Sequence, residues 1–320
     1  MKKILVTAIG SMAADMVIKT LHGNGHCVVG TDIYPKEWVV DAQNVEAFYN
    51  VPRVDDERLY VERLKEICLE QQIEYLIPLT DVEIDVLNAN RNQFQDVAIL
   101  CISGYETICM CRNKRETSDF LRQKSVCHTV PIYSDEEMES LKVMFPVVAK
   151  PADGRSSQGL RIFQEQEAAE LQSFYNRVHG GRYLFQPYLA GNVVTVDVVR
   201  NRNTNQCVAA ARREMLRTMN GAGLSVQVFR DSALEQNCMD IAKALDIHGC
   251  VNFEFIETEN QTRYFMECNP RFSGGVKFSA LAGYDFVTNH LRCFEGVEIE
   301  TPGRIQELYM ARKYEEYITG

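Results

Sequence analysis

The chain has 320 residues, of which 46% are hydrophobic and 24% are charged. This is an ordinary globular composition, sufficient for a large core and for two or three structural units. The net charge of −10 and the pI of about 5.2 disfavour a nucleic-acid partner, because no basic surface is available against phosphates. No apolar run reaches membrane-spanning length, so a membrane partner is not expected either.

Eleven cysteines and six histidines raise the question of disulfides and metal sites. No Cys-x-x-Cys occurs, and residues 1–7 read as a short strand rather than as a secretory leader. We therefore expect free thiols in a reducing cytoplasm. The histidines are scattered without the paired spacing of a zinc site.

Residues 1 to about 105 alternate short apolar runs with helical patterns. The apolar runs lie at 4–7, 27–31, 75–78 and 97–100, and the helical patterns at about 12–22, 57–70 and 82–94. This alternation predicts a parallel α/β sheet. The first turn keeps only Gly10 of a dinucleotide-binding fingerprint, although Asp32 ends the second strand, so we expect a Rossmann-like unit that binds no NAD.

Asp81 follows the third of these strands at its carboxyl end, where open α/β sheets present ligands. It would face the substrate there, or it would cap the next helix. The sequence leaves both interpretations open.

A helix is expected at about 112–125, and it contains Lys114. The apolar strand at 145–151 then carries Lys150, and lysines are rarely buried without an anionic partner. The loop at 152–159 is rich in Gly and Ser and differs from a Walker A loop, since Leu160-Arg161 replaces Lys-Ser/Thr. Its backbone N–H groups would cradle a phosphate, or it would be a plain hairpin loop; the neighbouring lysine favours the phosphate.

The second half of the chain predicts mostly antiparallel structure. Expected elements are a helix at 165–179, strands at 183–186, 193–200 and 206–212, and helices at 231–245, 276–282 and 285–295. The last twenty residues are polar and are expected to form a peripheral helix or a loose tail.

Two strand-like runs, 250–257 and 262–267, suggest a β-hairpin with Asn260-Gln261 as a two-residue loop. Counting outward from this loop places Glu254 opposite Glu267, with Asn269 on the same face. Two opposed carboxylates repel each other, so this face is expected to hold a cation, and oxygen-only ligands suit Mg²⁺. The alternative is a hairpin face whose charges point into water.

The order of these features closely resembles the ATP-grasp superfamily, especially ligases similar to one half of the carbamoyl phosphate synthetase large subunit. The resemblance covers roughly residues 1–296 and is most specific at Lys150-Pro151 and at Glu267-Cys268-Asn269-Pro270-Arg271. It implies an α/β fold with a Rossmann-like pre-ATP-grasp domain at 1–108, a two-lobed α+β ATP-grasp domain at 109–300 and a tail at 301–320. Residues about 126–190 would form a mobile lid.

The resemblance also implies roles for individual residues. Lys114 and Lys150 would contact the ATP phosphates, and Glu254, Glu267 and Asn269 would hold Mg²⁺, with Mn²⁺ as an alternative. Arg271 would steady the transferred phosphoryl group, and with Lys150 it forms the expected catalytic pair. The phosphate loop would use Gly154, Ser156, Ser157 and Gly159, and adenine would dock at Gln186, Pro187, Tyr188 and Leu189.

Substrate recognition is expected at Arg213, Ser273, Gly274 and Asp81, although solvated arginines are an equally good interpretation of the basic residues near 212–217. Val193 departs from the family, which usually has a ribose-binding Glu there. The implied function is an ATP-dependent ligase that joins a small-molecule carboxylate to an amine or thiol through an acyl phosphate, in a protein that could form a homodimer. The alternatives are a carboxylate-phosphorylating or carbamoyl-phosphate-type enzyme, and a non-catalytic ATP-binding regulatory protein.

Overall fold

The computed structural model describes residues 1–155, 158–178, 180–219 and 221–320. Its N-terminal domain is a five-stranded parallel sheet in the order β3-β2-β1-β4-β5, which confirms the predicted α/β unit. The strands are β1 (Lys3–Val6), β2 (Cys27–Asp32), β3 (Ala47–Asn50), β4 (Tyr75–Ile77) and β5 (Ile99–Leu100), and the helices are α1 (Ala14–Gly23), α2 (Glu57–Gln71) and α3 (Asp81–Ala89). The sequence did not predict β3, because this edge strand is short and only half-buried.

The carboxylate of Asp32, the last residue of β2, closes the first turn of this domain. Asp32 Oδ2 accepts a hydrogen bond from the Gly10 backbone N–H at 2.8 Å, and Asp32 Oδ1 accepts one from the Tyr34 N–H at 3.0 Å. The carboxylate thus satisfies the turn amide that a Rossmann pyrophosphate site would offer to its ligand.

Two helices connect the domains where one was expected. They are α4 (Tyr105–Arg112) and α5 (Lys114–Gln123). The break lies at Asn113, whose side chain accepts hydrogen bonds from the backbone N–H groups of Arg115 and Glu116, as an N-cap residue does. This cap fixes Lys114 as the first residue of α5.

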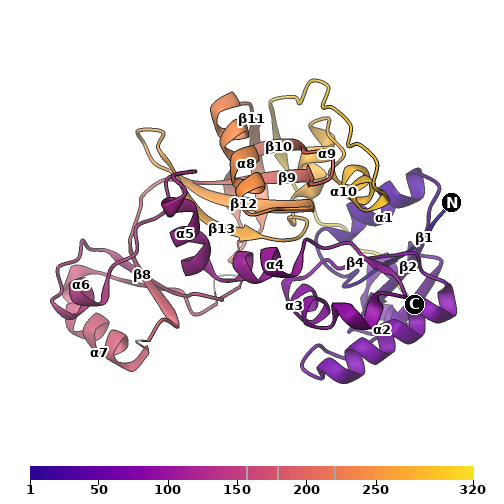
Figure 1. Cartoon of the computed structure of the whole chain (residues 1–320), viewed down its shortest axis with the longest axis horizontal. Coiled ribbons are helices and arrows are strands. Elements are labelled where there is room, and N and C mark those ends of the chain that lie inside the picture. The colour runs from indigo at the N-terminus through magenta and orange to yellow at the C-terminus, as the bar shows by residue number, and fades with distance from the viewer. Residues whose placement is uncertain (156–157, 179, 220) are drawn as a thin grey trace.

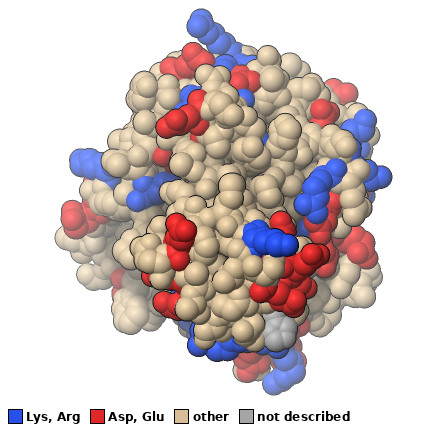
Figure 2. All heavy atoms as spheres, turned by 90° about the vertical axis from the view of Figure 1, so that its left-hand side faces the viewer, with Lys and Arg blue, Asp and Glu red and all other residues tan. Residues whose placement is uncertain are grey.

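The segment expected to be a lid folds as a small antiparallel sheet in the order β7-β6-β8, with two helices. Its elements are β6 (Val147–Pro151), β7 (Arg161–Phe163), β8 (Tyr183–Pro187), α6 (Asp135–Glu139) and α7 (Ala168–Val178). It has its own hydrophobic cluster, formed around Val147, Phe163 and Phe185, and lies at the opposite end of the molecule from the N-terminal domain (Figure 1). On this end, acidic and basic side chains are interspersed (Figure 2). Closure of the lid remains a prediction.

The large sheet is antiparallel and runs in the order β13-β12-β9-β10-β11-β14. Its strands are β9 (Asn192–Asn201), β10 (Gln206–Arg217), β11 (Gly223–Phe229), β12 (Gly249–Glu257), β13 (Arg263–Asn269) and β14 (Leu308–Ala311), and the helices are α8 (Ser232–Ala244), α9 (Val276–Leu281) and α10 (Phe286–Glu295). Alternation along β9 separates the two faces. Val194, Val196 and Val198 pack in the hydrophobic cluster that includes α8, whereas Thr195 lines the cavity described below.

The C-terminal segment corrects the expectation of a peripheral helix or loose tail. β14 adds an edge strand to the large sheet, and the last residues then return to the N-terminal domain, where both termini lie (Figure 1). Gln43 Nε2 donates a hydrogen bond to the carbonyl oxygen of Ile318 at 2.8 Å, and Thr319 Oγ1 donates one to that of Glu37 at 2.5 Å. None of the helices in the described residues is long and apolar enough to cross a membrane.

Candidate active site

A cavity of about 660 Å³ lies where the N-terminal domain, the small sheet and the large sheet meet. This volume is in the usual range for a small-molecule site. The side chains that the sequence marked as phosphate, metal and catalytic residues converge on it from α5, β6, β12, β13 and the turn after β13: Lys114, Lys150, Glu254, Glu267, Asn269 and Arg271.

The hairpin pairs Glu254 with Glu267, as predicted, but its loop length and its strand register differ from those expected. The expected two-residue loop is wrong: Glu257 pairs with Arg263, and the Thr258 N–H donates to the Thr262 carbonyl at 3.0 Å. The loop is therefore one residue longer. Phe255 pairs with Phe265 while Glu254 pairs with Glu267, so a bulge at Met266 restores the register that the loop had shifted.

The bulge also decides which side chains face the cavity. Met266 and Glu267 both line it, although they are adjacent in sequence. Phe265 and Cys268 are buried in the hydrophobic cluster on the opposite face of the sheet. Strict alternation would have put Phe265 on the same face as Glu267.

Each of the two opposed carboxylates has a basic partner. Glu267 Oε2 lies 3.3 Å from Lys114 Nζ, and Glu254 Oε2 lies 3.1 Å from Arg217 Nη2. Burial alone would raise both pKa values, but the charges of Lys114 and Lys150 lower the pKa of Glu267. Burial and the neighbouring Glu267 instead raise the pKa of Glu254. A divalent cation would relieve this repulsion between the two groups.

Asn269 completes the predicted metal set. Its Nδ2 donates to Asn252 Oδ1 at 3.2 Å and lies 3.3 Å from Glu267 Oε1, so its carbonyl oxygen is available to a cation. In the described residues no group of three or more His, Cys, Asp or Glu side chains comes together as a metal cage. Two carboxylates and one amide oxygen fit Mg²⁺, which keeps several positions for water and phosphate oxygens.

The two lysines form the opposite wall. Lys114 Nζ donates to the Gly154 carbonyl oxygen at 2.5 Å, which connects α5 to the loop after β6. Burial lowers the pKa of Lys150, and the nearby Glu267 opposes this effect. A partly buried ammonium with only partial compensation favours an anionic ligand such as a phosphate.

The loop after β6 has only partly the arrangement that was expected. Gly154 lines the cavity, whereas Gly159 is exposed and adopts φ +74°, and its neighbours Gln158 and Leu160 do line the cavity. The predicted Ser156 and Ser157 lie outside the described residues.

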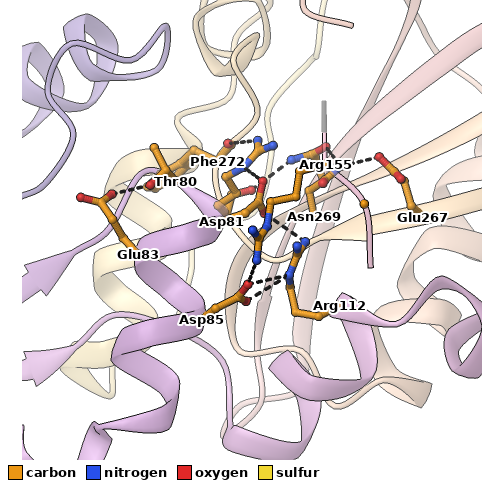
Figure 3. Close-up of polar contacts among 12 residues, drawn as sticks. Thr80, Asp81, Glu83, Asp85, Arg112, Arg155, Glu267, Asn269 and Phe272 are labelled. Carbon is orange, nitrogen blue, oxygen red and sulfur yellow. Dashed lines mark hydrogen bonds and ion pairs between the residues drawn. The ribbon is translucent and has the colours of Figure 1, made fainter. Parts of the chain in front are cut away.

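An ionic network connects this loop to the N-terminal domain (Figure 3). Arg271 Nε donates to Asp81 Oδ2 at 2.9 Å, and Arg112 Nη1 lies 3.6 Å from Asp81 Oδ1. Asp85 pairs with both Arg112 and Arg155. Burial would raise the pKa of Asp81, but the charges of Arg271 and Arg112 outweigh it and lower that pKa. The sequence reasoning missed Asp85, Arg112 and Arg155, since nothing local relates residues that lie in three separate segments.

The predicted adenine segment lies beside the cavity rather than in its described lining. Gln186 is buried in β8, and its Nε2 donates to the Val130 carbonyl oxygen at 3.3 Å. The Tyr188 N–H donates to the Pro146 carbonyl oxygen, which joins the segment Gln186, Pro187, Tyr188 and Leu189 to the start of β6. The cavity wall instead includes the apolar Val193, Ile256 and Met266.

Arg213, which was expected to contact the substrate, does not line the cavity. It pairs with Glu257 and stacks 3.8 Å from the centre of the Phe229 ring, on the face away from the cavity. Arg212 and Arg217 line the cavity instead, as do Ser273, Gly274 and Asp81. Arg212 is fully committed to buried partners, among them Asp197 and Ser273.

Two family models match separate parts of the chain. Residues 4–102 match the PylC-like N-terminal domain, and residues 181–316 match a family described as ATP-grasp in the biosynthetic pathway with Ter operon. The two matches fall on the parallel sheet and on the large sheet, respectively.

Individual proteins resemble this chain only weakly in sequence but strongly in structure. The carbamoyl phosphate synthase large chain of Saccharolobus solfataricus is 22% identical over 259 residues, which is 76% of this chain and only 24% of that protein. The biotin carboxylase domain of the Hydrogenobacter thermophilus 2-oxoglutarate carboxylase, solved with MgADP and bicarbonate, superposes with a TM-score of 0.75 at 19% identity over 94% of this chain and 71% of that chain. The L-amino acid ligase from Bacillus licheniformis superposes with a TM-score of 0.70 at 15% identity over 96% of this chain and 78% of that chain.

Proposed function

This chain belongs to the ATP-grasp superfamily, and on that premise we propose that it is an ATP-dependent ligase that joins a small-molecule carboxylate to an amine. The observation that carries the proposal is the Lys114–Glu267 contact at 3.3 Å. It brings the basic wall of the cavity against the acidic wall, and the gap beside it suits a triphosphate with its cation.

In the first step, a carboxylate oxygen of the acid attacks the γ-phosphorus of ATP, and the bond from that phosphorus to the bridging oxygen breaks to leave ADP. Lys114 and Lys150 would neutralise phosphate charge that otherwise repels the attacking carboxylate. Glu254, Glu267 and Asn269 would hold Mg²⁺, or Mn²⁺ in its place, which supplies charge neutralisation at the phosphate oxygens. Arg271 would contact the transferred phosphoryl group.

In the second step, the amine attacks the acyl carbon, the acyl–phosphate bond breaks, and the nitrogen loses a proton. The products are an amide, ADP and phosphate. This chemistry requires no side-chain nucleophile, because positioning and charge stabilisation supply most of the catalysis. It does require exclusion of water, since an acyl phosphate hydrolyses, and the small sheet at 126–190 is the part that would close.

The nucleoside would lie against Val193, Ile256 and Met266, with adenine reaching toward Gln186 and Leu189. Hydrophobic side chains suit the flat faces of a base and leave the phosphates to the lysines. With Val193 at this position, hydrogen bonds to the ribose would come from other groups.

The test is a screen of amino acids, other carboxylic acids and small amines for ADP and phosphate release with MgATP. Release that requires one acid and one amine supports the ligase. Release that requires an acid alone supports the carboxylate-phosphorylating alternative, and MgATP binding without turnover across the panel supports the regulatory alternative. Glu267→Gln is the negative control, and Arg213→Gln, on the other face of the sheet, is the matched control.

A further inference from the structure

Arg217 contacts a proposed metal ligand directly. Its Nη2 lies 3.1 Å from Glu254 Oε2, and its Nε donates to the Gly221 carbonyl oxygen at 2.8 Å. Both side chains are largely buried, with 25% of the Arg217 side chain and 16% of the Glu254 side chain exposed. The guanidinium therefore stands against the metal set and faces the same cavity.

The two partners of Arg217 differ in how they would respond to a cation. The Gly221 carbonyl is a backbone group of the loop after β10, closed by the Thr218 N–H donating to the Ala222 carbonyl at 2.8 Å. The Glu254 carboxylate is a ligand that a divalent cation would take, because a cation of charge two competes well for a carboxylate held by one guanidinium. Loss of this partner would leave one edge of Arg217 unpaired while Nε stays anchored.

An unpaired guanidinium edge in a partly buried cavity binds a carboxylate well, since its parallel N–H groups match the two carboxylate oxygens. The neighbouring chain leaves room on that side: Gly221, Ala222 and Gly223 also line the cavity and carry little or no side chain. Among the described residues, Glu254 is the one acidic side chain that accepts a hydrogen bond from Arg217.

We propose that Arg217 is a metal-released carboxylate receptor: it pairs with Glu254 until a divalent cation takes that carboxylate, and it then binds the carboxylate of the acid substrate. This rests on the proposed function and adds an order to it, in which the metal–nucleotide complex binds before the acid. The coupling is reciprocal, so the bound acid tightens metal binding by the same factor.

The first measurement is Mn²⁺ binding followed by electron paramagnetic resonance, without nucleotide. Arg217→Gln removes the competitor and should bind Mn²⁺ about fivefold more tightly than the wild type, the ratio expected from a partly buried ion pair. Arg217→Lys keeps the positive charge but loses the parallel N–H groups of the guanidinium. Its Mn²⁺ affinity should therefore lie between those of the wild type and of Arg217→Gln. Arg213→Gln removes a charge from the other face of the same strand and should match the wild type.

The second measurement follows the guanidinium itself. Phenylglyoxal modifies unpaired arginines, and peptide mapping by mass spectrometry reports Arg217 and Arg213 separately. Saturating Mn²⁺ should increase modification of Arg217 several-fold and leave Arg213 unchanged. Succinate should then protect Arg217, only when Mn²⁺ is present, whereas chloride at the same ionic strength should not.

The outcomes separate this inference from the proposed function. Mn²⁺ that binds wild type but not Glu267→Gln, with no change in Arg217 modification, would overturn the release of Arg217 and leave the metal site standing. If Mn²⁺ increases the modification of Arg217 but succinate does not then protect it, the role of Arg217 as a carboxylate receptor would be overturned. Failure of Mn²⁺ to bind any of these proteins, with ADP present as well as without it, would overturn the metal assignment, and with it both proposals.

Discussion

Arg271 donates a hydrogen bond from Nε to Asp81 Oδ2 at 2.9 Å, across the boundary between the large sheet and the N-terminal domain. Arg271 Nη1 also donates to the Phe272 carbonyl oxygen at 3.0 Å. These contacts fix one side of the guanidinium, while Arg271 still lines the cavity. Asp81 is therefore a positioning residue for Arg271.

Asp81→Asn should lower kcat of the proposed ligase by about 10- to 100-fold, the scale of a misplaced catalytic group, with little change in the KM for MgATP. The matched control is Asp85→Asn, which contacts Arg112 and Arg155 but not Arg271. Steady-state kinetics on the acid–amine pair from the screen measures both. Equal losses of kcat in the two variants would contradict a specific role for Asp81.

Glu267→Gln should abolish Mn²⁺ binding in the absence of nucleotide and reduce turnover by about 100- to 1,000-fold, the cost of removing one preorganised charge-stabilising group. The thermal midpoint should change little, because the amide can still contact Lys114 and Asn269. Paramagnetic resonance, calorimetry and ADP release check the three statements. An active Glu267→Gln enzyme would show that the metal assignment is wrong.

MgATP binding should be coupled to proton uptake at Lys150. Burial lowers the pKa of Lys150, so the protein without nucleotide disfavours the ammonium form, and a triphosphate beside it would favour that form and raise the pKa. Affinity for MgATP should therefore fall as pH rises through the pKa of the nucleotide-free protein. Isothermal titration in buffers of different ionisation enthalpy measures the protons. The Lys150→Arg variant, whose guanidinium is always protonated, should take up fewer protons when MgATP binds. Equal proton uptake by both proteins would show that Lys150 is not the group that gains the proton.

His290 should make the fold less stable in acid. Burial lowers the pKa of His290 to about 3, and its Nδ1 accepts a hydrogen bond from the Cys250 N–H at 2.8 Å. As pH falls below about 6.5, the unfolded chain binds a proton at this residue and the folded chain does not, so the free energy of unfolding decreases until about pH 3.

His290→Gln keeps an acceptor for the Cys250 N–H and removes the titration. Its free energy of unfolding should depend less on pH than that of the wild type between about pH 7.5 and about pH 4.5, as urea unfolding would show. Parallel curves for the two proteins would mean that His290 does not hold the lowered pKa.

The sequence by itself determined the classes of secondary structure and gave a prediction for the chemistry of the site. Period-two and helical patterns predicted the parallel sheet and the paired carboxylate strands, because burial on one face imposes those periods. The residue types also predicted a hard cation and a phosphate, since Lys114, Lys150, Glu254 and Glu267 are costly to bury unless something bridges them.

Only the tertiary structure decided which neighbours face the cavity. The bulge at Met266 offsets the longer hairpin loop and brings Glu267 opposite Glu254, and register shifts between Glu214 and Arg217 turn Arg217, rather than Arg213, into the cavity. The contacts of Asp81 with Arg271 and of Asp85 with Arg155 likewise join segments far apart in sequence. After a bulge, every later side chain lies on the opposite face of the sheet from the one that strict alternation predicts. The position of a bulge depends on packing between strands, so a local sequence pattern cannot locate it.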